Sequence, residues 1–218
     1  SLKLPASNPY GYWVSGLMAI YHCNIKTFSR SKGDSAISAI AYRTGTKLYC
    51  DRTGRVENYT KRKDVEFHQI VAPPNSPIWA YSTESLWQEV EKAENRKNST
   101  VAREFEYSLP HELNKEQRQK LAQELTQKLV DRFGFVAQYA IHAPKEKDSK
   151  NFHVHVLAST RKLSPTGFTE KTRELDEMMA KDKDNKNPVI VEVRAMIADV
   201  INAHLAAANI KEKVSHKS

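Results

Sequence analysis

The feature that most constrains this chain is a pair of short histidine-containing segments separated by a polar loop. The first segment ends in Ile141-His142, and the second reads Asn151-Phe152-His153-Val154-His155-Val156. Successive side chains of a strand point to opposite faces, so His153 and His155 share one face and the apolar residues share the other. The loop 143–150 contains a proline and several charged residues. This pattern predicts a β-hairpin that brings His142 opposite the other two histidines.

Three neutral imidazoles on one face of adjacent strands favour a divalent-metal site with positions left open for substrate. A single histidine on a strand is more often structural, but three together point to a metal. Such a metal can activate a water or bind a phosphate oxygen. The charge favours the second role, because 34 Lys and Arg residues outnumber 26 Asp and Glu, for a net charge of +8. A basic chain of this kind favours a polyanionic partner such as nucleic acid.

The periodicity of the remaining segments predicts an α+β fold. Strands are predicted over 19–28, 67–71, 101–109, 135–142 and 151–156, with a hairpin around 52–54, and helices over 36–42, 83–93, 114–134 and 189–208. Four of the strands have one apolar and one polar face. We therefore expect a central antiparallel β-sheet with helices packed on its apolar face and the active site on the other face. The charged segment 161–187 is predicted to be a loop with at most one short helix.

Length and cysteine content suit one intracellular domain. Residues 1–17 are interpreted as a tag or upstream extension, and 18–218 as a single domain. Two cysteines, Cys23 and Cys50, are too few for a disulfide framework, which favours a reducing cytoplasm. No apolar run reaches the length of a membrane span, so membrane insertion is not expected.

Two further kinds of side chain are candidates for chemistry. Glu104 and Glu106 share one strand face, where they can orient an imidazole or take a proton from a nucleophile; a solvated strand face is the alternative interpretation. The nucleophile can be a water or a side chain. Tyr42 lies away from the apolar stripe of its helix and is the candidate side chain. A tyrosine has a pKa of about 10, so it needs a base or a nearby cation to ionise.

From Met18 onward the chain resembles the MobA/MobL family of plasmid mobilisation relaxases, within the wider His-hydrophobic-His endonucleases. The resemblance rests on five stretches in matching order and spacing: Met18-Ala19-Ile20-Tyr21-His22, Ser35 through Ala41-Tyr42-Arg43-Thr44-Gly45, Arg103-Glu104-Phe105-Glu106-Tyr107-Ser108-Leu109-Pro110, Ala140-Ile141-His142, and Asn151-Phe152-His153-Val154-His155-Val156. Many family members have Asn-Pro-His where this chain has Asn151-Phe152-His153. The resemblance implies that the chain is an N-terminal relaxase domain.

The resemblance also implies a site- and strand-specific nicking reaction at a plasmid origin of transfer. Tyr42 is then the nucleophile that forms a reversible 5′-phosphotyrosyl intermediate. Mg²⁺ or Mn²⁺ is the implied cofactor, bound by His142, His153 and His155. Glu104 or Glu106 is implied to deprotonate Tyr42 or to fix a histidine, and the sequence does not choose between these roles.

Basic residues near the proposed site are candidates for phosphate contacts, which position DNA without reading its sequence. These candidates are Lys26, Arg30, Lys32 and Arg43. Tyr49 follows the nucleophile helix and is a candidate second tyrosine or base-stacking platform, with an ordinary hairpin aromatic as the favoured alternative.

The implied partners are single-stranded DNA at the origin of transfer, accessory relaxosome proteins and a type IV secretion coupling protein. The implied location is the bacterial cytoplasm, with transfer alongside the DNA to a recipient cell left open. Three other functions remain as alternatives. They are a rolling-circle replication initiator of the same superfamily, a single-stranded DNA-binding module without catalysis, and a three-histidine zinc hydrolase.

Overall fold

The computed structural model describes residues 22–145, 150–176 and 188–215. The strands are β1 Cys23–Ser29, β2 Lys47–Cys50, β3 Arg55–Asn58, β4 Val65–Val71, β5 Thr100–Leu109, β6 Phe135–His142, β7 Phe152–Ser164 and β8 Gly167–Lys171. The helices are α1 Ala36–Thr44, α2 Thr83–Ala93, α3 Lys115–Phe133 and α4 Pro188–Ala207. Three short 3-10 helices are η1 Arg30–Lys32, η2 Ile78–Tyr81 and η3 Arg173–Leu175.

A central antiparallel sheet organises the molecule, as the sequence predicts. Its strand order is β1-β5-β7-β6-β4, with β8 added to the far half of β7, while β2 and β3 form a separate hairpin. The predicted histidine hairpin is β6–β7, and its register places His142 opposite His153. Strand β5 runs on the other side of β7, so Glu106 lies opposite His155. The register alone therefore gathers the polar side chains of three strands.

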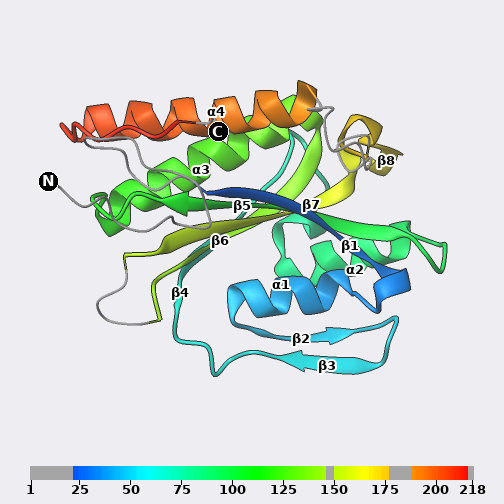
Figure 1. Cartoon of the computed structure of the whole chain (residues 1–218). Helices are drawn as coiled ribbons and strands as arrows, with labels where there is room; N and C mark the ends of the chain where they lie inside the picture. The colour runs from blue at the N-terminus through cyan, green and yellow to red at the C-terminus, as the bar shows by residue number, and fades with distance from the viewer. Residues whose placement is uncertain (1–21, 146–149, 177–187, 216–218) are drawn as a thin grey trace, which may run out of the picture.

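Helices α3 and α4 cover the apolar face of the sheet (Figure 1). Phe105, Tyr139 and Val156 point from the strands into this layer and are fully or almost fully buried. The sequence marks both ends of α3. Asn114 forms a capping box with Gln117, and Gly134 ends the helix with a φ of 73°, a conformation that suits glycine.

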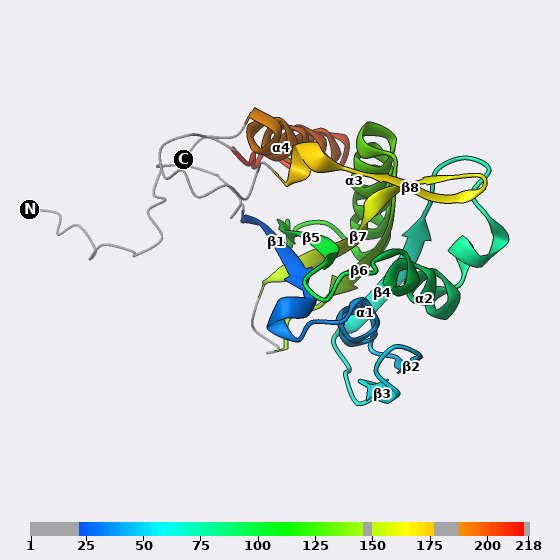
Figure 2. The same cartoon turned by 90° about the vertical axis from the view of Figure 1, so that its right-hand side faces the viewer.

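The opposite face is covered in part by α1 and α2, which the sequence analysis did not place there (Figure 2). Their apolar side chains meet Val136 of β6 and Leu157 of β7, which point away from the α3–α4 layer. This face is therefore apolar beneath the two helices. It becomes polar further along the same strands, where the histidines and glutamates lie. The site thus sits beside α1 on a face that is only partly open.

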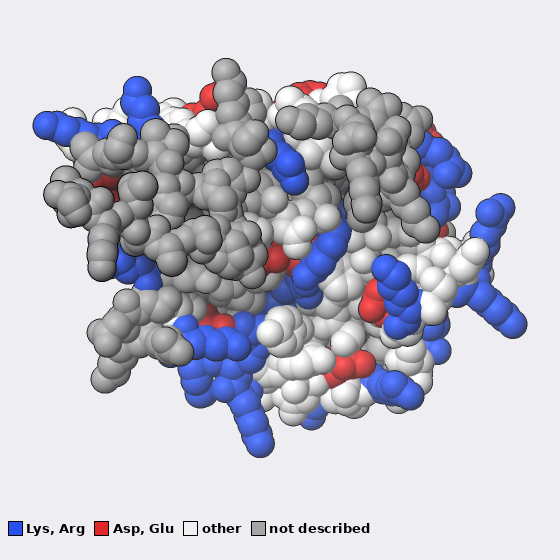
Figure 3. Space-filling model, in the orientation of Figure 1, with Lys and Arg blue, Asp and Glu red and all other residues white. Residues whose placement is uncertain are grey.

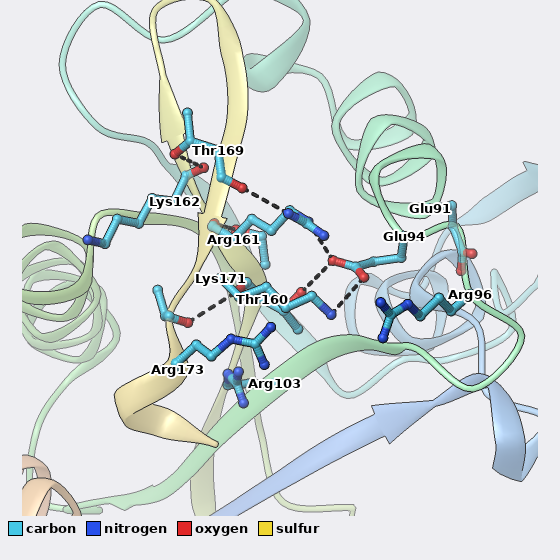
Figure 4. Close-up of polar contacts among 12 residues, drawn as sticks. Glu91, Glu94, Arg96, Arg103, Thr160, Arg161, Lys162, Thr169, Lys171 and Arg173 are labelled. Atoms are coloured by element: carbon cyan, nitrogen blue, oxygen red, sulfur yellow. Dashed lines mark hydrogen bonds and ion pairs between the residues drawn. The ribbon is translucent and has the colours of Figure 1, made fainter. Parts of the chain in front are cut away.

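The predicted loop over 161–187 is wrong for its first part. Strand β7 continues to Ser164 and turns back into β8. Leu163 and Phe168 pack into the cluster beneath α1 and α2, and the residues between them, Ser164-Pro165-Thr166-Gly167, form the turn of the hairpin. The hairpin is tied to the end of α2 through Glu94, which binds Thr160, Arg161 and Lys171 (Figure 4).

Several predicted segments lie wholly or partly outside the described part of the chain. These are the extension over 1–17, residues 19–21 of the first predicted strand, residues 146–149 of the predicted hairpin loop, and residues 177–187 of the predicted charged loop. None of the described helices combines the length and the apolar character that crossing a membrane requires.

Candidate metal centre and its tyrosine

Three histidines meet at the β6–β7 hairpin as predicted. The ring centroids of His142, His153 and His155 are 4.6 to 5.4 Å apart. One nitrogen from each ring lies within 4.8 Å of the others, so small side-chain rotations bring all three to one ion. Imidazole nitrogens suit Zn²⁺, Mn²⁺ and other first-row divalent cations, and a set of three leaves coordination positions for substrate.

Each imidazole has an acceptor for one ring nitrogen, which fixes its orientation. His142 Nε2 donates to the Arg43 carbonyl oxygen at 2.7 Å, and His153 Nδ1 lies 3.2 Å from the Asn151 carbonyl oxygen. His155 Nδ1 lies 3.2 Å from a Glu104 carboxylate oxygen. When one nitrogen donates in this way, the other carries the lone pair that a metal requires. The arrangement therefore fits a three-imidazole metal site.

Burial keeps two of the three histidines, His142 and His153, neutral. Burial lowers the pKa of His142 to about 4, and the nearby guanidinium of Arg62 acts in the same direction. Burial also lowers the pKa of His153. A metal competes with protons for the same nitrogen, so these two ligand candidates are available at neutral pH.

Glu104 stands behind His155 and is fully buried. It pairs with the guanidinium of Arg43, and Lys26 Nζ lies 2.9 Å from its second oxygen. Burial alone would raise the pKa of Glu104, but hydrogen bonds with His155 and Arg43 outweigh it and hold the pKa well below its usual range. Glu104 is therefore a permanent carboxylate that orients His155. Glu106 is only half-buried, lines the cleft, and shares a possible ion-binding group with Glu104 and His155.

A cleft joins the histidines to Tyr42. Its walls are formed by Lys26, Tyr42, Arg43, Arg62, Asp64, Glu106, His142, Ala143, Pro144, Lys145, Asn151, His153 and His155. Tyr42 lies near the end of α1, between the Ser35 N-cap and the Gly45 C-cap, and 41% of its surface is exposed. The helix thus presents the phenol to the same open space as the three imidazoles.

The segment between β3 and β4 contacts Tyr42, and the sequence analysis did not single it out. The Arg62 guanidinium carbon lies 4.0 Å from the centroid of the Tyr42 ring, and the Tyr59 ring approaches the same ring edge-on at 5.3 Å. Asp64 binds Arg62, and this hydrogen bond lowers the pKa of Asp64 to about 2. Basic side chains gather over this segment in Figure 3, and its sequence contains Lys61-Arg62-Lys63. This basic run was the one feature of the sequence that could have marked the segment. No helix or strand periodicity in the sequence placed the segment beside α1.

The predicted DNA-binding residues lie in different environments. Lys26 lines the cleft, and Lys32 is exposed on η1. Arg43 also lines the cleft, but it is buried, pairs with Glu104 and packs 4.8 Å from the Phe28 ring, so its guanidinium already has a partner. Arg30 is bound to Glu91 and to backbone carbonyl groups at the end of α2. Tyr49 is exposed on β2 and is not among the residues that line the cleft.

The proteins that this chain resembles in sequence are named for mobilization or for conjugal transfer. The profile of the MobA/MobL family matches residues 34–218. The chain is 33% identical to the mobilization protein MobL of Acidithiobacillus ferridurans, over 92% of this chain and 58% of that protein. It is 29% identical to the conjugal transfer protein TraA of Agrobacterium fabrum, over 71% of this chain and 14% of that protein. The chain therefore spans less than two thirds of these relatives.

A solved structure agrees with the fold. It is described as the molecular basis of vancomycin resistance transfer in Staphylococcus aureus, and it superposes with a TM-score of 0.78 at 27% identity. The superposition covers 92% of this chain and all of that one. With the profile match over most of the sequence, these findings show that the chain belongs to the MobA/MobL family of plasmid mobilisation proteins.

Proposed function

We propose that this domain is a metal-dependent DNA relaxase that nicks one strand at a plasmid origin of transfer, with Tyr42 as the nucleophile. The observation that carries the proposal is that Tyr42 and the three histidines line one cleft. The basic side chains of Lys26 and Lys145 line the same cleft and suit a phosphodiester backbone. The names of the relatives, which refer to mobilization and conjugal transfer, support a role at the origin of transfer.

In the proposed reaction, the Tyr42 hydroxyl oxygen bonds to the scissile phosphorus while the bond from phosphorus to the 3′ oxygen breaks. The phenolic proton passes to a base, and the departing 3′ oxygen takes up a proton to become a hydroxyl. The 5′ phosphate stays on Tyr42 as a phosphotyrosine. One ester is exchanged for another, so the reverse reaction can rejoin the strand.

The side chains of the cleft divide the remaining roles. His142, His153 and His155 would hold Mg²⁺ or Mn²⁺, which when bound supplies positive charge to a phosphate oxygen. Glu104 is held by two cations and stays ionised, so its role is to orient His155. Glu106 lines the cleft without such a pairing to Arg43, and we assign it the role of proton acceptor. Single-stranded DNA, accessory relaxosome proteins and a type IV coupling protein are the partners of this proposal, in the bacterial cytoplasm.

An adduct assay tests the proposal. Single-stranded oligonucleotides from plasmid transfer origins, with replication origins as a second set, are incubated with the protein with and without Mn²⁺. A covalent adduct that survives SDS is expected on a transfer origin and only with metal. Tyr42→Phe should remove the adduct, whereas Tyr81→Phe, which changes an exposed tyrosine outside the cleft, should not.

Each contrary result has a definite meaning. An adduct in Tyr42→Phe would exclude Tyr42, and its loss in Tyr49→Phe would identify a different nucleophile. Cleavage confined to replication origins would assign a rolling-circle initiator instead. Tight binding of DNA with no adduct on either set would leave a binding module.

A further inference from the structure

The contact between Arg62 and Tyr42 is the strongest feature that the proposed mechanism does not use. Arg62 comes from the segment that links β3 to β4. One backbone hydrogen bond holds this segment against the turn that follows α1, because Tyr59 N donates to the Thr46 carbonyl oxygen at 3.0 Å. A second bond, from Arg62 N to the Tyr59 carbonyl oxygen at 3.0 Å, forms a turn within the segment itself.

Gly45 allows this close approach. Its φ is +65°, and a Cβ atom at this position would lie 3.1 Å from Val65 Cγ2 and 3.6 Å from Arg62 Cβ. A larger residue would therefore be strained and would push the linking segment away from the helix. The linking segment therefore packs closely against the last turn of α1, which is the turn that carries Tyr42.

Two hydrogen-bond partners, Asp64 and the Tyr42 carbonyl group, fix Arg62. Its Nε donates to Asp64 Oδ1 at 2.9 Å, and its Nη1 donates to the Tyr42 carbonyl oxygen at 3.1 Å. Its Nη2 lies 3.4 Å from His142 Nδ1. Only 13% of the Arg62 side chain is exposed, and its charge is balanced by Asp64. A guanidinium held in this way is not an open phosphate anchor, because its donors already have partners.

The face of this fixed guanidinium lies against the Tyr42 ring at 4.0 Å. A cation over an aromatic face is attracted by the ring, and Arg provides the planar surface for it. The Tyr59 ring packs against the Tyr42 ring in an edge-to-face arrangement, with 5.3 Å between the two ring centroids. Tyr42 is partly exposed and could otherwise take up more than one rotamer.

We propose that Arg62 is a positioning residue that holds the Tyr42 ring in one rotamer toward the histidine cleft, and that Asp64 holds Arg62 in place. The proposal rests on Tyr42 being the nucleophile, and it adds a link between the nucleophile and His142 through one side chain. Arg62 does not react. It restricts the rotation of the Tyr42 side chain before the reaction, so less conformational entropy is lost when the phenol reaches the phosphorus.

The test uses the whole chain with Arg62→Ala, Arg62→Lys and the control Arg132→Ala. Arg132 lies at the end of α3 on the other face and makes surface ion pairs, so its removal changes the net charge equally. For Arg62→Ala we expect kcat for oligonucleotide cleavage to fall by about tenfold to a hundredfold, with KM within about threefold. Arg62→Lys should recover part of this loss, because an ammonium can contact the ring but cannot also bind Asp64 and the Tyr42 carbonyl group.

Calorimetry with Mn²⁺ alone separates positioning from metal binding. We expect Arg62→Ala to bind Mn²⁺ as well as Arg132→Ala does. Loss of Mn²⁺ binding in Arg62→Ala would overturn the proposal, because Arg62 would then act on the metal site. A raised KM with unchanged kcat and a shallower dependence of binding on salt would also overturn it, since that result describes a phosphate contact.

A readout without DNA keeps this inference separate from the proposed function. The protein is labelled with 3-fluorotyrosine, and the Tyr42 resonance in the ¹⁹F spectrum is assigned by its loss in Tyr42→Phe. We expect Arg62→Ala, and not Arg132→Ala, to shift and broaden or split this resonance. An unchanged Tyr42 resonance overturns the positioning role. A wild-type protein that forms no adduct on any oligonucleotide overturns the proposed function, whatever the spectrum shows.

Discussion

Two buried carboxylates, Glu104 and Glu94, each contact two basic side chains, but only Glu104 also contacts a candidate metal ligand. Glu94 binds Arg161 and Lys171 at 2.8 Å, and its partners belong to the β7–β8 hairpin (Figure 4). Glu104 binds Lys26, Arg43 and His155. Burial would raise the pKa of both groups, and their basic partners bring both below the ordinary value.

The two carboxylates, each taken with its charged partners as a network, differ in which part of the molecule those partners belong to. The Glu94 network ends in a hairpin that it fastens to α2, so its effect is on stability. The Glu104 network ends in an imidazole that lines the cleft beside Tyr42. Similar charge pairing therefore fixes a backbone segment in one place and the orientation of a candidate metal ligand in the other, and measurements can separate the two.

The largest effect is expected for a change to one of the three candidate metal ligands. His153→Ala removes one of three imidazoles, and we expect Mn²⁺ affinity to fall by about a hundredfold or more, with cleavage lost in parallel. Calorimetry and the adduct assay measure the two effects. Excess chelator should stop nicking by the wild type, and added Mn²⁺ should restore it. Unchanged Mn²⁺ binding in His153→Ala would contradict the three-histidine site.

Glu104→Gln should affect both function and stability. The amide no longer balances Arg43, whose guanidinium stays buried, and a broken buried ion pair costs about 3 kcal/mol or more of the free energy of unfolding. The orientation of His155 is also weakened, so Mn²⁺ affinity should fall by about tenfold. Urea unfolding and calorimetry are the measurements. A loss of stability with unchanged Mn²⁺ affinity would make Glu104 equivalent to Glu94.

Glu94→Gln should affect stability alone. Its partners Arg161 and Lys171 are partly exposed and can turn to water, so we expect a loss of about 2 kcal/mol in the free energy of unfolding. Mn²⁺ affinity and kcat should match those of the wild type. A fall in kcat without a fall in stability would show that the hairpin communicates with the cleft.

We also expect Glu94→Gln to change how the free energy of unfolding depends on pH in acid. The folded-state pKa of Glu94 is lowered, so its ionisation stabilises the fold at neutral pH, and this contribution is lost as pH falls below the ordinary value of 4.5 through the folded-state pKa. Glu94→Gln carries no such group, so its stability should decline less than that of the wild type between about pH 5 and pH 3. Urea unfolding at several pH values measures both slopes. Parallel slopes would show that Glu94 does not titrate in this range.

The smallest effect is expected for Lys26→Ala. Lys26 pairs with Glu104, but its side chain is 44% exposed, so the ion pair should contribute less than about 1 kcal/mol to the free energy of unfolding. Binding of single-stranded DNA should weaken modestly, and the slope of the logarithm of the binding constant against the logarithm of salt concentration should become shallower by about one. A large loss of stability would show that Glu104 depends on Lys26 as much as on Arg43.

The parts of the fold that follow local rules were predictable. Alternation along β6 and β7 was sufficient to place His142 opposite His153, and the caps Asn114 and Gly134 were sufficient to bound α3. The packing of α1 and α2 onto the histidine face was not predictable in the same way. It depends on contacts between Val136 or Leu157 and helices that are distant in sequence.

Charge pairing was the least predictable part of the candidate site. The sequence placed Arg43 among the phosphate contacts because it follows Tyr42, yet in the structure it turns inward to Glu104, 61 residues later. Arg62 was overlooked for the opposite reason. It lies in an irregular segment whose position beside α1 depends on Gly45 and Val65, and neither residue marks that contact in the sequence.

The histidine hairpin has a consequence for the order in which the site is assembled. Its three imidazoles lie within one pair of neighbouring strands, whereas Tyr42 is about a hundred residues earlier in the chain. Local pairings close sooner than distant ones, because a short loop loses less entropy on closure. Under the proposed mechanism, a nascent or partly unfolded chain would therefore hold a cation before it can attack DNA, and strand cleavage would report completion of the whole domain.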